Sequence, residues 1–232
     1  MTDGTRRHVL VTGGSRGIGR AIAADLALDS HVLVGGRDPE AVAAVVAELP
    51  SAEPFVCDLS DESATTAAAQ SISRLDAIVH SAGIADGAPV AELTRERLRH
   101  IFEVNLFAVA DLTRLLLPLL RASGRGHVIA LNSGSGLATG PGGTLYNGSK
   151  HALRVFTDAL REEERGRIRV TSIHPGRTHS DMQRELQESM GNAYDATKYL
   201  TPESVASTVR LALDASPEAQ VEMLSIRPVI AG

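Results

Sequence analysis

The chain has 232 residues, of which 22% are charged and 43% hydrophobic, and its formal net charge is −5. These values are ordinary for a soluble protein, and the interspersed Lys and Arg residues argue against a nucleic-acid-binding surface. The longest apolar runs, such as residues 115–120, are too short to span a membrane, no signal-peptide core develops, and the lone Cys57 can form no internal disulfide. We therefore expect one cytoplasmic domain over residues 1–232, with Cys57 as a small core residue.

Apolar runs with strand character alternate along the chain with longer segments whose apolar residues have helical spacing. The expected strands cover residues 8–12, 31–35, 54–57, 75–80, 126–132, 167–173 and 221–226. The expected helices cover residues 17–28, 41–49, 95–117, 144–164 and 202–214, the last capped by Thr201 and opened by Pro202. This alternation predicts an α/β fold with a seven-stranded parallel sheet and helices on both faces.

The first expected strand runs directly into a glycine-rich turn that opens a helix. The turn reads Thr12-Gly13-Gly14-Ser15-Arg16-Gly17-Ile18-Gly19. In this arrangement backbone N–H groups and the helix dipole receive a pyrophosphate, and glycines let the backbone approach it. The spacing differs from the common Gly-x-Gly-x-x-Gly fingerprint, and no Gly-Lys-Ser/Thr follows as in a Walker loop. The turn predicts dinucleotide binding, although such turns also occur without ligands.

The end of the second expected strand indicates which dinucleotide is bound. It reads Gly35-Gly36-Arg37, without the carboxylate that NAD-specific sites use for the ribose 2′-hydroxyl. Arg37 and Arg16 can instead clamp a 2′-phosphate, so we expect NADP(H) in preference to NAD(H). The alternative for Arg37 is a solvated loop arginine paired with Asp38. Asp58 can hydrogen-bond the adenine amino group.

A tyrosine and a lysine four residues apart are the main candidates for chemistry. Tyr146 and Lys150 share one face of the expected helix 144–164. Alone, this spacing is equally typical of a half-exposed tyrosine beside a surface lysine. Ser133 follows the fifth expected strand, and Asn105 lies in the helix 95–117 within an apolar run. The alternatives for these two are an ordinary loop serine and a satisfied helix asparagine.

Several motifs occur together in one order and spacing. They are Thr12-Gly13-x-x-x-Gly17-x-Gly19, Asp58-Leu59, Ala82-Gly83, Asn105, Ser133, Tyr146-x-x-x-Lys150 and Pro175-Gly176. With these motifs, over nearly all of its length, the chain resembles the short-chain dehydrogenase/reductase family, in the standard-length branch with one doubly wound Rossmann-type domain. The resemblance implies an oxidoreductase that transfers a hydride between a nicotinamide cofactor and a carbonyl or secondary-alcohol substrate.

The resemblance also implies a role for each matching residue. Tyr146 would be the general acid/base, and Lys150 and the cofactor's charge would lower its pKa from the ordinary phenol value of about 10. Lys150 would also hold the nicotinamide ribose, Ser133 would hydrogen-bond the substrate oxygen, and Asn105 would hold a proton-relay water. The implied cofactor contacts are Gly13, Ser15, Arg16, Gly17, Ile18, Gly19, Arg37, Asp58, Leu59, Ala82, Gly83, Tyr146, Lys150, Pro175, Gly176, Thr178 and Ser180.

The chain departs from the family pattern at two places. His80-Ser81-Ala82-Gly83 stands where the family has Asn-Asn-Ala-Gly, so side-chain contacts that support the sheet should change. Ser180 replaces the usual Thr before Met182 and retains a hydroxyl for the carboxamide, while Thr178 should offer its backbone near the nicotinamide amide.

Three histidines lie near these motifs. His174 and His179 lack a convergent ligand set, so we expect no metal site and interpret them as loop histidines, with a substrate contact possible for His179. His151 should point elsewhere on its helix.

Substrate choice should depend on two segments that follow expected strands. Residues 178–199 lack a sustained apolar period and are expected to form a mobile segment over the site, with a short helix possible at 182–190; residues 134–144 form the other loop. The family resemblance suggests a homo-oligomer, a tetramer or dimer, packed through helices 95–117 and 144–164. The competing function is a non-catalytic NADP-binding sensor or regulatory protein, because the fold alone does not dictate chemistry.

Overall fold

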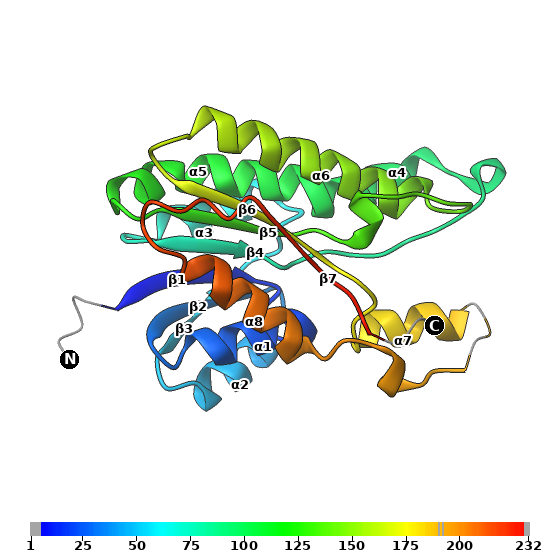
Figure 1. Ribbon diagram of the computed structural model, residues 1–232, viewed down its shortest axis with the longest axis horizontal. Helices are drawn as coiled ribbons and strands as arrows, with labels where there is room; N and C mark the ends of the chain where they lie inside the picture. The colour runs from blue at the N-terminus through cyan, green and yellow to red at the C-terminus, as the bar shows by residue number, and fades with distance from the viewer. Residues whose placement is uncertain (1–5, 190, 192, 230–232) are drawn as a thin grey trace.

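The computed structural model describes residues 6–189, 191 and 193–229 and forms one seven-stranded sheet (Figure 1). Every neighbouring pair of strands is parallel, and the order is β3-β2-β1-β4-β5-β6-β7. The strands are β1 Arg7–Thr12, β2 Ser30–Gly36, β3 Ala52–Val56, β4 Ala77–His80, β5 His127–Leu131, β6 Arg169–Pro175 and β7 Met223–Ile226. The expected seven-stranded, doubly wound parallel sheet is confirmed.

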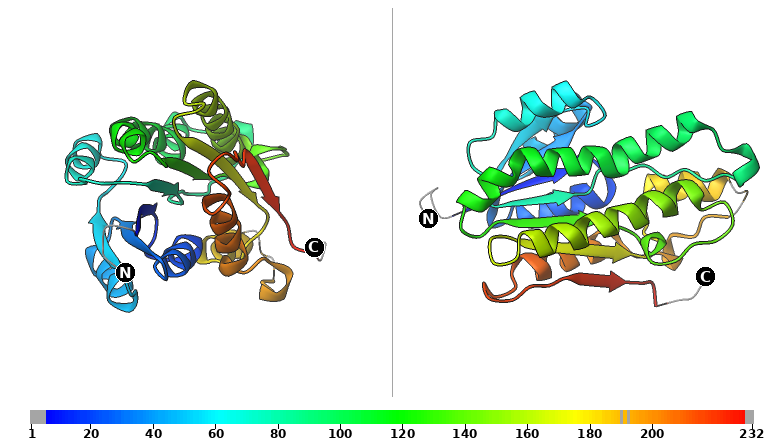
Figure 2. Two further views of the ribbon diagram at one scale, coloured as in Figure 1. Left: turned by 60° about the vertical axis from the view of Figure 1, so that its left-hand side comes forward. Right: turned by 90° about the horizontal axis from the view of Figure 1, so that it is seen from above.

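Helices cover both faces of this sheet (Figure 2). The α-helices are α1 Gly17–Leu26, α2 Pro39–Glu48, α3 Glu62–Gln70, α4 Arg95–Phe102, α5 Ala108–Ala122, α6 Thr144–Glu163, α7 Asp181–Ser189 and α8 Pro202–Leu213. Val9 and Val11 of β1 lie in the cluster that contains residues of α1, α2 and α8. Leu10 lies in the opposite cluster, with residues of α3, α5 and α6. This alternation follows from the two-residue period of a strand.

The carboxyl ends of β1 and β4 meet where the strand order reverses. The Thr12 Oγ1 atom accepts hydrogen bonds from the N–H groups of Ser81 and Ala82, both at 3.1 Å. At Gly13, where φ is +64°, a Cβ atom would lie 2.9 Å from the Ala82 Cα atom, so only glycine fits. Open α/β sheets bind ligands in the crevice at such a switch point.

The expected helix 95–117 is interrupted, which corrects that prediction. α4 ends at Phe102, a π turn η3 covers Glu103–Phe107, and α5 continues to Ala122. The turn contains the buried Asn105, whose amide is bonded outside the helix, and π turns of this kind often lie at functional sites. Apolar periodicity continues across the turn, so the sequence alone showed a single helix.

α3 was missed in the sequence, although its N-terminus is well defined. The Asp61 carboxylate caps it by accepting the N–H groups of Ser63 and Ala64. The helix buries only Thr65 and Ala69, because its other side chains are short or polar. An apolar stripe that small gives no recognisable helical period.

β6 begins and ends two residues later than the expected 167–173. The N–H groups of Arg167 and Ile168 donate to the Glu164 carbonyl and so belong to the turn that follows α6. Consequently His174 lies inside β6, paired with Ser225 of β7, and is fully buried. The interpretation of His174 as a loop histidine is therefore wrong.

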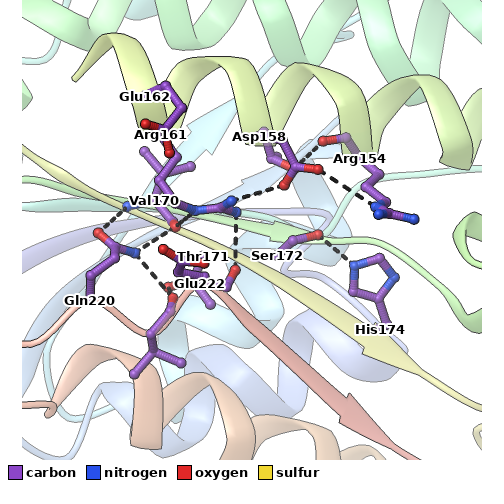
Figure 3. A network of polar contacts seen from close by, with 12 residues as sticks. Arg154, Asp158, Arg161, Glu162, Val170, Thr171, Ser172, His174, Gln220 and Glu222 are labelled. Carbon is purple, nitrogen blue, oxygen red and sulfur yellow. Dashed lines mark hydrogen bonds and ion pairs between the residues drawn. The ribbon is translucent and has the colours of Figure 1, made fainter. Parts of the chain in front are cut away.

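A buried arginine fastens α6 to β6 and to the chain before β7 (Figure 3). Arg161 donates to the carbonyls of Val170 and Glu222, each at 3.0 Å, and pairs with Asp158 at 2.9 Å. Gln220 reinforces the junction by donating to the Val170 carbonyl. These bonds hold the C-terminal half of α6 against the sheet, and α6 also carries Tyr146 and Lys150.

Candidate active site

Tyr146 and Lys150 lie one turn apart near the start of α6, as the sequence predicts. The Lys150 side chain is buried, and its Nζ atom donates to the Leu131 carbonyl at the end of β5 at 3.0 Å. The same Nζ atom lies 5.8 Å from the centre of the half-buried Tyr146 ring. The pair is therefore anchored to the carboxyl end of the central sheet and is not a surface pair.

Burial controls the protonation of both side chains. Burial lowers the pKa of Lys150 from 10.5 to about 8. Burial raises the pKa of Tyr146, and a hydrogen bond with the Ser133 side chain offsets part of that rise. The phenol is thus protonated at neutral pH and can donate a proton.

Ser133 lies just beyond β5, which ends at Leu131 instead of the expected residue 132. Its Oγ atom caps the 3₁₀ turn η4 (Gly134–Gly136) by accepting the Ser135 N–H at 3.1 Å. Its own N–H donates to the Asn132 side-chain oxygen at 2.9 Å. Ser133 therefore has a defined conformation, and its side chain lies close enough to Tyr146 to influence the pKa of the phenol.

Asn105 finds the partners that a buried amide requires. Its oxygen accepts the Ile84 N–H at 2.9 Å, and its nitrogen donates to the Ile84 carbonyl and to Ser149 Oγ. A Cβ atom at Gly83 would lie 3.2 Å from the Asn105 oxygen and 3.7 Å from Lys150 Nζ. Asn105 thus joins the loop after β4 to α6 beside Lys150.

The glycine turn leaves open the space that a pyrophosphate needs. Gly17 has φ +54°, and a Cβ atom there would meet only the Ser180 Cβ atom, 3.9 Å away. A Cβ atom at Gly19 would lie 2.1 Å from the Gly13 carbonyl oxygen, which keeps the turn tight. Among the described residues no side chain caps α1 at Arg16, so its first N–H groups are free to bind an anion. The residues present fit a dinucleotide.

An exposed arginine follows the last residue of β2 at this edge of the sheet. Arg37 is exposed, and its charge helps to lower the pKa of Asp58, after hydrogen bonds from Ser60, so the two side chains lie near each other. A Cβ atom at Gly36 would lie 2.6 Å from the Val42 side chain. The Asp38 carboxylate caps α2.

The other predicted cofactor contacts lie at the same edge of the sheet or support it. Ile18 and Leu59 pack against the two core clusters with partly buried side chains. The Gly176 N–H donates to the Ile226 carbonyl at 2.7 Å, which fixes the turn after the buried Pro175. The Thr178 hydroxyl donates back to the Gly176 carbonyl at 3.1 Å.

Ser180 occupies the start of α7, which is the short helix that 182–190 suggested, shifted by one residue. Its Oγ atom accepts the Gln183 N–H and donates to the Thr178 carbonyl. Residues 177–179 pair with Leu200, so both ends of the 178–199 segment are tied together. Residues 190 and 192 of this segment lie outside the described residues.

His80 explains how the departure from the family pattern is accommodated. The Thr113 hydroxyl donates to the Val109 carbonyl, so its oxygen accepts a hydrogen bond from His80 Nε2 at 2.9 Å. Burial lowers the pKa of His80 to about 3, and the ring is neutral. The imidazole therefore connects β4 to α5, which is a changed side-chain contact at this position.

The three histidines near the sequence motifs have contacts within the protein. His179 Nδ1 lies 2.7 Å from the Tyr194 hydroxyl, and Tyr194 stacks on Tyr199 with ring centres 4.9 Å apart. His151 Nδ1 bonds the Asn147 carbonyl of its own helix. His174 contacts the Ser133 loop, a link that nothing in the sequence indicated. Over the described part of the chain, no group of three His, Cys, Asp or Glu residues could hold a metal ion.

Comparisons with known proteins show the family to which the chain belongs. The model of the short chain dehydrogenase family matches residues 7–191. A short-chain type dehydrogenase/reductase of Sinorhizobium fredii is 34% identical over 228 residues, covering 94% of this chain and 90% of that protein. The chain therefore belongs to the short-chain dehydrogenase/reductase family of oxidoreductases. No helix within the described residues is long and apolar enough to cross a membrane.

Two solved structures of similar proteins contain NADP. A candidate NAD(P)-dependent gluconate 5-dehydrogenase of Beutenbergia cavernae, with NADP bound at low occupancy, is 32% identical with a TM-score of 0.85, covering 94% of each chain. A closed form of serine dehydrogenase complexed with NADP⁺ is 25% identical, also with a TM-score of 0.85, covering 94% of this chain and 93% of that one. Relatives that share this fold thus bind an NAD(P) cofactor.

Proposed function

We propose that this protein transfers a hydride between NADP(H) and a carbonyl or secondary-alcohol substrate, with Tyr146 as the general acid/base. The observation that carries the proposal is the convergence of Tyr146, Lys150, Ser133 and Asn105 beside the glycine turn. A noncatalytic cofactor sensor has no need for a buried lysine held beside a tyrosine.

The proton chemistry follows from the environments of two hydroxyl groups. In carbonyl reduction, the protonated Tyr146 hydroxyl donates a proton to the substrate oxygen as negative charge develops there. The Ser133 hydroxyl, held at the turn η4, donates a second hydrogen bond to the same oxygen and stabilises that charge. In the oxidative direction, Tyr146 takes the proton from the alcohol. The bound nicotinamide would supply or accept the hydride.

Lys150 and Asn105 lie behind the tyrosine. The Lys150 ammonium favours the phenolate by its charge, and it would also hold the nicotinamide ribose. The Asn105 amide already uses both N–H donors on protein groups. A relay water at this position would therefore bind the side-chain oxygen or the main-chain carbonyl oxygen of Asn105. A proton would then pass between bulk water and Tyr146 by way of Lys150.

The preference for NADP(H) rests on the chain after β2. A guanidinium at Arg37 can form paired, charge-assisted hydrogen bonds with a 2′-phosphate. A carboxylate at Gly36 would have to displace Val42, so the NAD-specific arrangement does not fit there. Two relatives with bound NADP support the same choice.

We further propose a cytoplasmic homo-oligomer that packs through the outer faces of η3–α5 and α6. Phe107 of η3 is 52% exposed and Val155 of α6 is 68% exposed, and the burial of exposed large apolar side chains favours association with a partner. Sedimentation velocity on the purified protein tests for a dimer or tetramer.

A ketone panel tests the proposed activity directly. The purified protein is mixed with NADPH or NADH and with 2,3-butanedione, ethyl acetoacetate, cyclohexanone or acetophenone, and cofactor oxidation is followed by absorbance at the nicotinamide band. We expect substrate-dependent oxidation of NADPH with a higher kcat/KM than for NADH. Tight NADPH binding without turnover of any carbonyl in this or a wider panel would favour the sensor instead.

A further inference from the structure

Two side chains bind the backbone N–H and the backbone carbonyl of Ser133, just beyond the regular sheet. The last ladder bond of β5 is the Asn132 N–H to the Ile173 carbonyl, at 2.7 Å. Beyond it, the Asn132 side-chain oxygen accepts the Ser133 N–H, and His174 Nδ1 lies 2.9 Å from the Ser133 carbonyl oxygen. That oxygen also accepts the Gly136 N–H at 3.0 Å, so both of its lone pairs are used.

The hydrogen positions on His174 follow from its neighbours. A carbonyl oxygen can only accept, so Nδ1 carries a hydrogen and donates it to Ser133. His174 is fully buried and burial lowers its pKa, so the ring is neutral and Nε2 is an acceptor. Ser172 Oγ, 2.8 Å from Nε2, donates to it (Figure 3). The Ser133 carbonyl thus fixes the tautomer, and the Ser172 hydroxyl, two residues earlier on the same strand face, completes the bonding of the ring.

The backbone of His174 is also fixed. His174 is paired with Ser225 of β7, and the Arg227 guanidinium donates to the His174 carbonyl. The same guanidinium packs against the residue after Ser133, because a Cβ atom at Gly134 would lie 2.9 Å from Arg227 Nη2. The imidazole is therefore held at both ring nitrogens and at its backbone.

We propose that His174 is a positioning residue for the reaction: its Nδ1–H group fixes the Ser133 peptide and thereby orients the Ser133 hydroxyl toward Tyr146 and the substrate oxygen. This inference rests on the proposed function, in which the Ser133 hydroxyl contacts the substrate. His174 does not touch the reacting atoms, and its effect on the rate passes through Ser133.

Two substitutions at this position separate the two hydrogen bonds. In His174→Asn the amide nitrogen can take the place of Nδ1 and keep the bond to Ser133, while the contact with Ser172 is lost. In His174→Gln the longer side chain can reach Ser172, while the bond to Ser133 is lost. The pair keeps a neutral amide at the site and changes only which neighbour it reaches.

The test measures kcat, KM and the NADPH dissociation constant, using the carbonyl compound of the panel that is reduced fastest. We expect His174→Gln to lower kcat about 10- to 100-fold, since small displacements of a reacting geometry have effects of this size. We expect KM and NADPH affinity to stay within about twofold, and His174→Asn to keep kcat within about threefold, because substrate and cofactor contacts are intact. In a Ser133→Ala background, His174→Gln should change kcat by less than about twofold, since the hydroxyl it orients is gone.

The outcomes distinguish this inference from the function on which it rests. If Ser133→Ala keeps full activity, the proposed catalytic role of Ser133 is wrong. If Ser133→Ala is impaired but His174→Gln lowers kcat equally in both backgrounds, His174 does not act through Ser133. The same conclusion follows if His174→Asn lowers kcat as much as His174→Gln does. A ¹⁵N NMR spectrum of the histidine rings in the unsubstituted protein does not depend on whether the variants fold. We expect it to show a neutral His174 ring protonated at Nδ1. A ring that is charged, or protonated at Nε2, overturns the inference.

Discussion

The Lys150 ammonium lies 5.8 Å from the centre of the Tyr146 ring and donates a hydrogen bond to the carbonyl of Leu131. This lysine is buried with one acceptor, a backbone carbonyl, among the described residues, so its charge is stabilised much less than it is in water. A bound cofactor and a phenolate would both stabilise the ammonium. The pair therefore couples the protonation of Lys150 to the occupancy of the site.

The first prediction concerns stability and the Lys150 charge. The pKa of Lys150 is about 8 in the folded protein against an ordinary 10.5, so the unfolded chain binds more protons between these values. The free energy of unfolding should therefore rise with pH across this window. Urea unfolding gives the free energy of unfolding of the unsubstituted protein and of Lys150→Met. We expect the first value minus the second to increase by about 3 kcal/mol from pH 7 to pH 10.5.

The exposed Lys198 provides the matched control for that measurement. The urea unfolding of Lys198→Met is measured under the same conditions. It shows which part of any pH effect is specific to the buried site. A difference between wild type and Lys150→Met that stays constant from pH 7 to pH 10.5 would mean that Lys150 is not a strained, buried cation.

The second prediction concerns cofactor choice. Arg37→Ala should weaken NADPH binding about 10- to 100-fold, the value of a charge-assisted hydrogen-bond pair, and leave NADH binding unchanged. Arg20→Ala is the control, because Arg20 is an exposed arginine on α1 that pairs with Glu48 at 2.5 Å. Isothermal titration with both cofactors measures the effect. Equal loss of NADPH and NADH affinity in Arg37→Ala would show that Arg37 does not read the 2′-phosphate.

The third prediction concerns acid stability and His80. Burial places the pKa of His80 at about 3, below its ordinary 6.5, so the unfolded chain takes up a proton that the folded protein does not. The contribution of His80 to stability is thus present above pH 6.5 and is lost as pH falls toward 3. Relative to His80→Asn, we expect the protein to lose about 3 kcal/mol of unfolding free energy between pH 7 and pH 4.

Thermal and urea unfolding at both pH values measure this difference. Other buried histidines titrate in both proteins and cancel in the comparison, so the difference reports on position 80 alone. Parallel pH profiles for the two proteins would contradict a neutral, buried His80 bonded to Thr113.

The sequence predicted the sheet well because strand periodicity and glycine turns are local signals. The spacing of Tyr146 and Lys150 likewise needed only the helical repeat, and the structure brings both together with Ser133 and Asn105. The π turn at Asn105 was not predictable, because it depends on bonds to Ile84, which is distant in the sequence. Helix α3 was missed because it buries only two small side chains.

His174 shows most clearly where sequence reasoning ends. Its neighbours Ser172 and Pro175 are close in the chain, but its function depends on the Ser133 carbonyl, 41 positions away. Only the parallel pairing of β5 and β6 brings the two together. A histidine before Pro-Gly has no motif meaning by itself, so a structure was needed to find this contact.

Turnover of Tyr146→Phe tests the central claim most directly. The substitution removes one hydroxyl and keeps the ring that packs against the cluster of Ala88, Ile101 and Leu145. We predict that kcat falls about 10²- to 10⁴-fold, the usual contribution of a general acid, while NADPH affinity and the melting temperature stay unchanged. If Tyr146→Phe binds NADPH normally and retains kcat within about tenfold of the unsubstituted protein, below the range of a general acid, Tyr146 is not the proton donor and the proposed mechanism is wrong.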